Sequence, residues 1–89
     1  MSGCERTVTL CNERGLHARA SAKFVRLAES FDAQVTVHKA GQSVVGTSIM
    51  GLMLLAAACG ESILIQADGA DGQAALEALC DLVLRGFDE

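Results

Sequence analysis

Three stretches of this chain alternate apolar and polar residues, and this alternation restricts the possible folds more than any other feature. In residues 5–11, Val8 and Leu10 lie on one side of the chain, with threonines between and before them. Residues 34–39 and 62–68 repeat the pattern. Such alternation predicts β-strands with one apolar and one polar face. The strands therefore predict a sheet with one buried face, which a second layer must cover.

Helical segments between the strands can supply that second layer. Residues 18–31 and 73–85 carry apolar side chains at helical spacing and polar ones on the opposite face. Residues 49–58 predict a shorter helix, with Ser48 as its N-cap because a serine hydroxyl can accept a bond from a first-turn N–H. Asp71 is the candidate cap of the last helix.

A further short strand completes the predicted sheet. Residues 43–45 follow a tight connection at 40–42, so they form a hairpin with the strand at 34–39. The predicted order is βαββαβα. We therefore expect an α+β fold, an open-faced two-layer β-sandwich whose four-stranded, mostly antiparallel sheet is covered on one face by three helices.

Length and composition limit the class of protein. A chain of 89 residues is too short for a second core, so we expect a single domain over residues 1–89. A net charge of −4 and only three aromatic residues argue against nucleic-acid binding. We see no signal peptide and no apolar run long enough to span a bilayer, so we expect a cytoplasmic protein without membrane insertion. The four cysteines lack metal-ligand spacing, and we expect small apolar side chains, no metal and no cofactor.

A histidine stands at the predicted start of the first helix. His17 follows Gly15, and helix starts have unpaired N–H groups and a partial positive charge, which stabilise an anion. Arg19, Lys23 and Arg26 recur at spacings of four and three and therefore share one helix face. This pattern favours a nucleophilic imidazole beside a phosphate-binding site. A histidine cap and a solvated basic face remain the alternatives.

The predicted helix at 49–58 is apolar almost all round. Ile49, Met50 and Met53 would point away from the core if Leu52 faces it. Flexible methionine side chains are typical of surfaces that dock several partners. The alternative is a helix that is buried on two sides.

Two motifs carry a resemblance to a known family. Gly15-Leu16-His17-Ala18-Arg19 resembles the active-site motif of HPr, the histidine-containing phosphocarriers of the phosphoenolpyruvate-dependent phosphotransferase system, and residues 47–53 resemble the regulatory-serine segment of that family. The spacing between the motifs fits without a gap. The end, residues 86–89, is more similar to the nitrogen-branch carriers than to the sugar-branch ones. One departure is Ala20, where the family usually has proline.

The resemblance implies a function and site residues. His17 would accept a phosphoryl group on Nδ1 from enzyme I and pass it to an enzyme IIA. Arg19 would bind the phosphoryl oxygens, helped by N–H groups around Ala18 and Arg19. Ser48 would match the serine that an HPr serine kinase/phosphorylase modifies. The partner-docking surface would comprise Ile49, Met50 and Met53.

Two other functions stay open at this point. One is a regulatory binding module whose partner binding is toggled by phosphorylation. The other is a small phosphatase, which would need a second catalytic group, and Glu13 is the one carboxylate that the sequence places near His17. We expect a monomeric carrier that partner enzymes phosphorylate and dephosphorylate, rather than an enzyme.

Overall fold

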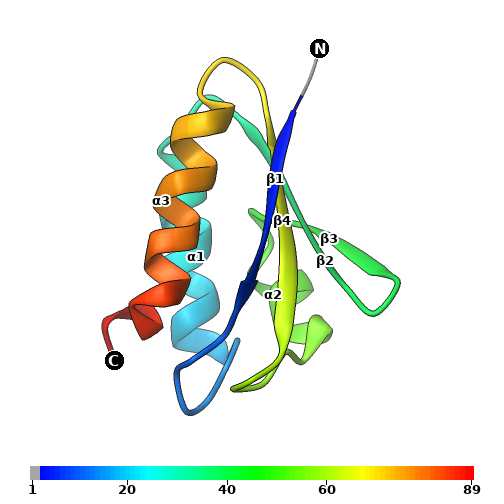
Figure 1. Ribbon diagram of the computed structural model, residues 1–89, viewed down its shortest axis with the longest axis vertical. Coiled ribbons are helices and arrows are strands. Elements are labelled where there is room, and N and C mark those ends of the chain that lie inside the picture. Colours follow the sequence, from blue (N-terminus) through cyan, green and yellow to red (C-terminus); the bar gives the residue numbers. More distant parts are fainter. Residues whose placement is uncertain (1–2) are drawn as a thin grey trace.

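The computed structural model describes residues 3–89, which form four strands and three α-helices in the predicted order (Figure 1). The elements are β1 (Cys4–Thr9), α1 (Ala18–Glu29), β2 (Gln34–Lys39), β3 (Gln42–Val45), α2 (Ile49–Leu55), β4 (Ser62–Asp68), α3 (Gly72–Leu84) and a 3-10 turn, η1 (Gly86–Asp88).

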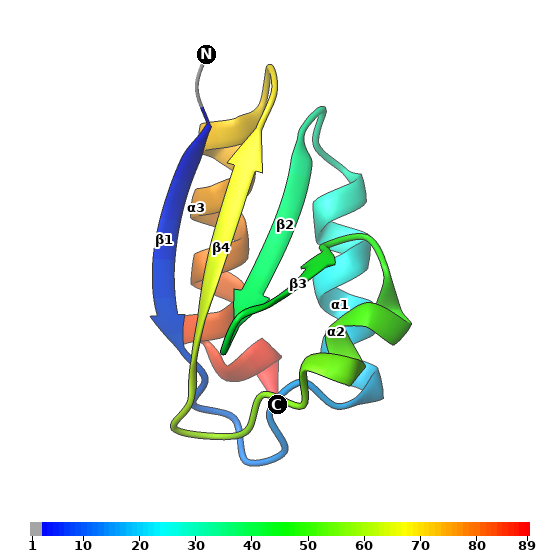
Figure 2. The same cartoon turned by 90° about the vertical axis from the view of Figure 1, so that its right-hand side faces the viewer.

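The strands form one sheet in the spatial order β1-β4-β2-β3, and every neighbouring pair is antiparallel. Val8 pairs with Ile63, and Val37 pairs with Ile65, so buried side chains share one face. The helices cover that face and leave the other open (Figures 1 and 2). The predicted open-faced α+β sandwich is therefore confirmed.

The core is mainly aliphatic and includes two phenylalanines. Phe24 of α1 and Phe87 of η1 are both fully buried. Phe87 therefore belongs to the core, whereas Asp88 and Glu89 after it are exposed. Among residues 3–89, Cys80 is buried and Cys4 is half-buried, whereas Cys11 and Cys59 are exposed.

Element ends differ from the predictions where tertiary contacts decide them. α2 ends at Leu55, three residues before the predicted end, because Ala56 adopts a left-handed conformation with φ of 53°. The carbonyl of Ala57 then accepts a 2.9 Å hydrogen bond from the N–H of Leu16. Asp71 does not cap α3 with its side chain, since its carboxylate accepts from the N–H of Asp32 at 2.8 Å. The bond between Leu16 and Ala57 holds the chain after α2 against the loop that precedes His17.

Candidate functional site

His17 is the N-cap of α1. Its backbone is extended, and its Nδ1 accepts a hydrogen bond of 3.3 Å from the N–H of Arg19. The capping role that the sequence left open is confirmed. The imidazole therefore lies at the positive end of a 12-residue helix, where an anion is stabilised.

The helix start is well bonded although Ala20 replaces the family's proline. The N–H of Ser21 donates to the carbonyl of His17 at 2.9 Å, and the buried Ser21 hydroxyl donates to the carbonyl of Leu16 at 3.2 Å. Ala20 itself is fully buried. These bonds fix the residues on both sides of the imidazole without the constraint of a proline ring.

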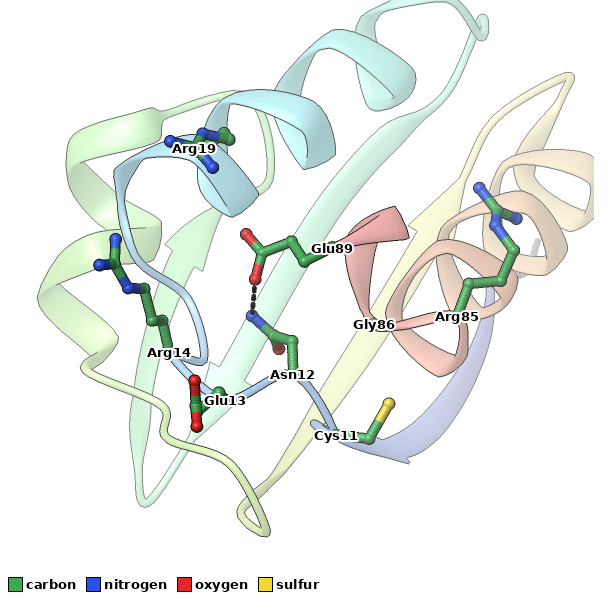
Figure 3. A pocket seen from close by; sticks show the side chains of 8 residues that line it. All are labelled: Cys11, Asn12, Glu13, Arg14, Arg19, Arg85, Gly86 and Glu89. Carbon is green, nitrogen blue, oxygen red and sulfur yellow. Dashed lines mark hydrogen bonds between the residues drawn. The ribbon is translucent and has the colours of Figure 1, made fainter.

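A carboxylate from the far end of the chain contacts the other nitrogen of His17. Glu89 bonds to Nε2. Asn12 Nδ2 donates to the same carboxylate at 3.2 Å, as the dashed line in Figure 3 shows. Asn12 is buried, and its Nδ2 also donates to the carbonyl of Gly15 at 2.8 Å. The sequence analysis, which found only Glu13 near His17, missed Glu89. No local pattern could have revealed it, since the two residues are 72 positions apart.

The two partners of His17 define its neutral tautomer. A backbone N–H can only donate, so the Nδ1 that accepts from Arg19 carries the lone pair. An ionised carboxylate can only accept, so the Nε2 that faces Glu89 carries the proton. The lone pair of neutral His17 is therefore on Nδ1, the nitrogen that the resemblance implies as the phosphoryl acceptor.

The C-terminal turn is held in place by a bond to α1, by an ion pair of its own and by a bond to the loop after β1. Lys23 Nζ donates to the carbonyl of Phe87 at 2.6 Å, and Arg85 pairs with Asp88 at 2.9 Å. The thiol of Cys11 donates to the carbonyl of Leu84 at 3.5 Å. Together with the burial of Phe87, these contacts place Glu89 beside His17.

The carboxyl group of Glu89 should titrate below its ordinary pKa of 4.5. Burial raises its pKa, but the hydrogen bonds from Asn12 and His17 and the charges of His17 and Lys23 outweigh that effect. A lowered folded-state pKa means that the contact contributes stability above the unfolded pKa and loses it as the pH falls through the folded value. We expect a midpoint below 4.5 for the side-chain carboxyl carbon in an NMR titration. It should rise in Asn12→Ala, and a midpoint above 4.5 in the wild type would contradict the inferred network.

A pocket of about 520 Å³ opens beside this network. Its lining includes Asn12, Arg14, Arg19, Arg85 and Glu89 (Figure 3). Arg19, the second residue of α1, is exposed and makes no ion pair with a carboxylate of residues 3–89. Its guanidinium is therefore available to an anion from outside the chain. Ala18, the first residue of α1, is exposed too.

The predicted regulatory and docking residues lie on and before α2. Ser48 is the N-cap, as predicted, and its Oγ accepts from the N–H of Gly51 at 3.0 Å. Ile49, Met50 and Met53 are 41%, 69% and 42% exposed. Leu54 is 71% exposed and was not predicted as part of this surface. The alternative of a helix buried on two sides is therefore wrong.

Residues 3–89 contain no group of three His, Cys, Asp or Glu side chains that could hold a metal ion. Over the same residues, no helix is both long and apolar enough to cross a membrane.

Comparisons with known proteins agree with this geometry. A family model described as "PTS HPr component phosphorylation site" matches residues 4–84. The chain is 43% identical to the phosphocarrier protein NPr of Shewanella violacea, over 100% of this chain and 98% of that protein. It is 45% identical to the phosphocarrier protein HPr of Cupriavidus necator, over 96% of both chains. Its fold matches the crystal structure of HPr-C-His from Thermoanaerobacter tengcongensis with a TM-score of 0.93 and 40% identity, over 97% of each chain. The chain therefore belongs to the HPr family, the phosphocarrier proteins of the phosphotransferase system.

Proposed function

We propose that this protein accepts a phosphoryl group on His17 Nδ1 from enzyme I and passes it to an enzyme IIA. The observation that carries the proposal is the pair of hydrogen bonds that His17 makes, from the N–H of Arg19 to Nδ1 and between Nε2 and Glu89. Together they leave the Nδ1 lone pair at the N-terminus of α1. In this role the protein is a carrier rather than an enzyme, because each transfer needs a partner protein. We expect this carrier to be cytoplasmic and monomeric. The test is phosphorylation by phosphoenolpyruvate and enzyme I, compared between wild type and His17→Ala.

The transfer requires a rearrangement at Nδ1. As the new bond from phosphorus to Nδ1 forms, the hydrogen bond from the Arg19 N–H to Nδ1 is lost. That N–H, with the N–H of Ala18, can then donate to a phosphoryl oxygen, and the Arg19 guanidinium can pair with another. Each such charged hydrogen bond contributes about 1.5–3 kcal/mol at most. This modest stabilisation suits a carrier, which must release the group to the next protein.

The partners are expected to dock on the surface formed by Ile49, Met50 and Met53. This apolar surface lies on α2, and α2 packs against α1, whose N-terminus carries His17. The cations Arg19, Lys23 and Arg26 on α1 favour partners with acidic groups around an apolar centre. A regulatory binding module could use the same surface, and transfer of the phosphoryl group to an enzyme IIA distinguishes a carrier from such a module.

Phosphorylation of Ser48 by an HPr serine kinase/phosphorylase is expected to weaken docking without unfolding α2. A phosphate adds about −1.5 to −2 charge, which the N-terminus of a helix tolerates but acidic partners do not. We expect Ser48→Asp to slow enzyme I-dependent phosphorylation of His17 about tenfold at low salt. Ser48→Ala is the matched control, which should lose about 1 kcal/mol of stability as the cap is removed but keep its rate. An unchanged rate in Ser48→Asp would contradict the regulatory role.

A further inference from the structure

Arg14 lies three residues before His17 and lines the same pocket as Arg19. We propose that Arg14 is a second cationic ligand of the phosphoryl group on His17, an inference that rests on the function proposed above.

The backbone that carries Arg14 is fixed on both sides. The N–H of Gly15 donates to the carbonyl of Asn12 at 3.1 Å, and the Asn12 side chain bonds back to the carbonyl of Gly15. Leu16 is tied to Ala57 by its own N–H, at 2.9 Å. Arg14 is therefore presented from a closed turn, although its side chain is exposed.

Arg14 and Arg85 both line the pocket but differ in their position and in their ion pairs. The side chains of Arg14 and Arg19 lie on the same side as the Glu89 carboxylate, whereas Arg85 lies on the opposite side (Figure 3). Arg85 is already paired with Asp88 through two nitrogens, at 2.9 and 3.3 Å. Within residues 3–89, neither Arg14 nor Arg19 forms an ion pair with a carboxylate. Glu13 and Glu89 also line the pocket, but no carboxylate of residues 3–89 holds either of these two guanidinium groups in an ion pair, so both are available to an added anion.

The charge of the transferred group matches two cations better than one. The bond from phosphorus to the donor breaks as the bond from phosphorus to Nδ1 forms, and the proton on Nε2 stays in place against Glu89. No proton is released, so the imidazole ring gains one positive charge while the phosphoryl oxygens bring close to two negative charges beside the Glu89 carboxylate. Because Glu13 and Glu89 also line the pocket, the charged ring and Arg19 would leave this site negative, and Arg14 offsets one further unit of that charge.

An equilibrium measurement can isolate the contact between Arg14 and the phosphoryl group. The fraction of protein phosphorylated on His17 is measured by intact mass across a series of phosphoenolpyruvate-to-pyruvate ratios, with a catalytic amount of enzyme I. Because a catalyst does not shift an equilibrium, the ratio at half phosphorylation reports the stability of the phosphorylated protein and not its docking to enzyme I. We expect Arg14→Gln to require a ratio about fivefold higher than wild type, which is the upper range for an exposed ion pair.

Two variants control for charge and for location. Arg14→Lys keeps a cation and should recover most of the shift. Arg6→Gln removes an exposed cation on β1, outside the lining of the pocket, so its ratio should equal that of wild type. Circular dichroism would establish that each variant is folded.

The outcomes for the two proposals are separable. A wild-type protein that accepts no phosphoryl group from competent enzyme I would overturn the proposed function. A wild-type protein that is phosphorylated normally, with Arg14→Gln at the same half-point, would overturn only the role of Arg14. A slower approach to an unchanged half-point would also overturn it, because it would place Arg14 in docking.

Discussion

His17→Ala is expected to abolish phosphorylation by phosphoenolpyruvate and enzyme I, because it removes the Nδ1 lone pair at the start of α1. Intact-protein mass after incubation measures the result. The wild type should gain one phosphoryl group, and this group should be lost in acid because a phosphorus–nitrogen bond is acid-labile. Loss of the reacting atom leaves no alternative acceptor in the site, so we expect no detectable adduct on the variant.

His38→Ala is the matched control for a general effect of losing histidine. His38 lies on β2, on the open face of the sheet, where it bonds to Ser43 at 2.6 Å and to Gln66. It is the other histidine of the chain, and its strand lies away from the start of α1. The variant should accept one phosphoryl group like the wild type. An adduct that persists in His17→Ala, or one that disappears only in His38→Ala, would contradict the assignment of His17 as the phosphoryl acceptor.

The sequence was sufficient where the determinants are local. Alternation in residues 34–39 and 62–68 predicted β2 and β4 with their exact bounds. His17 and Arg19 lie within one turn, and Ser48 stands directly before α2. In each case the sequence pattern and the strand or helix start that it predicts lie within the same few residues. Periodicity and capping therefore predicted the fold and the part of the site that surrounds Nδ1.

The sequence was insufficient where distant segments meet. Glu89 and Asn12 reach each other and His17 only because α3 and η1 return along α1. Neither residue has a spacing that connects it to His17. The early end of α2 has the same origin, since Ala56 is left-handed without a glycine, and Ala57 then binds Leu16. Half of the contacts of the imidazole therefore depend on tertiary packing.

Gly15→Ala is expected to be among the most damaging single substitutions outside the core, because Gly15 combines two constraints. Its φ is +62°, a left-handed value that costs a residue with a side chain about 1–2 kcal/mol. A Cβ on this residue would also lie 2.2 Å from the carbonyl oxygen of Ala57, which is backbone and cannot rotate away. Relief of that clash requires separation of the loop from the segment after α2. We expect a loss of about 3 kcal/mol or more in the free energy of unfolding, measured in urea.

Gly41→Ala is the control that separates the cost of the left-handed backbone from the cost of the clash with Ala57. Gly41 is also left-handed, with φ of +82°, but a Cβ there would meet nothing within 4 Å. This variant should lose only the conformational cost, about 1–2 kcal/mol, and keep the wild-type rate of His17 phosphorylation. Gly15→Ala should lose both stability and rate, because the bond from Leu16 to Ala57 lies next to the acceptor. Equal losses of stability in the two variants, with equal rates, would mean that the close approach to Ala57 does not position His17.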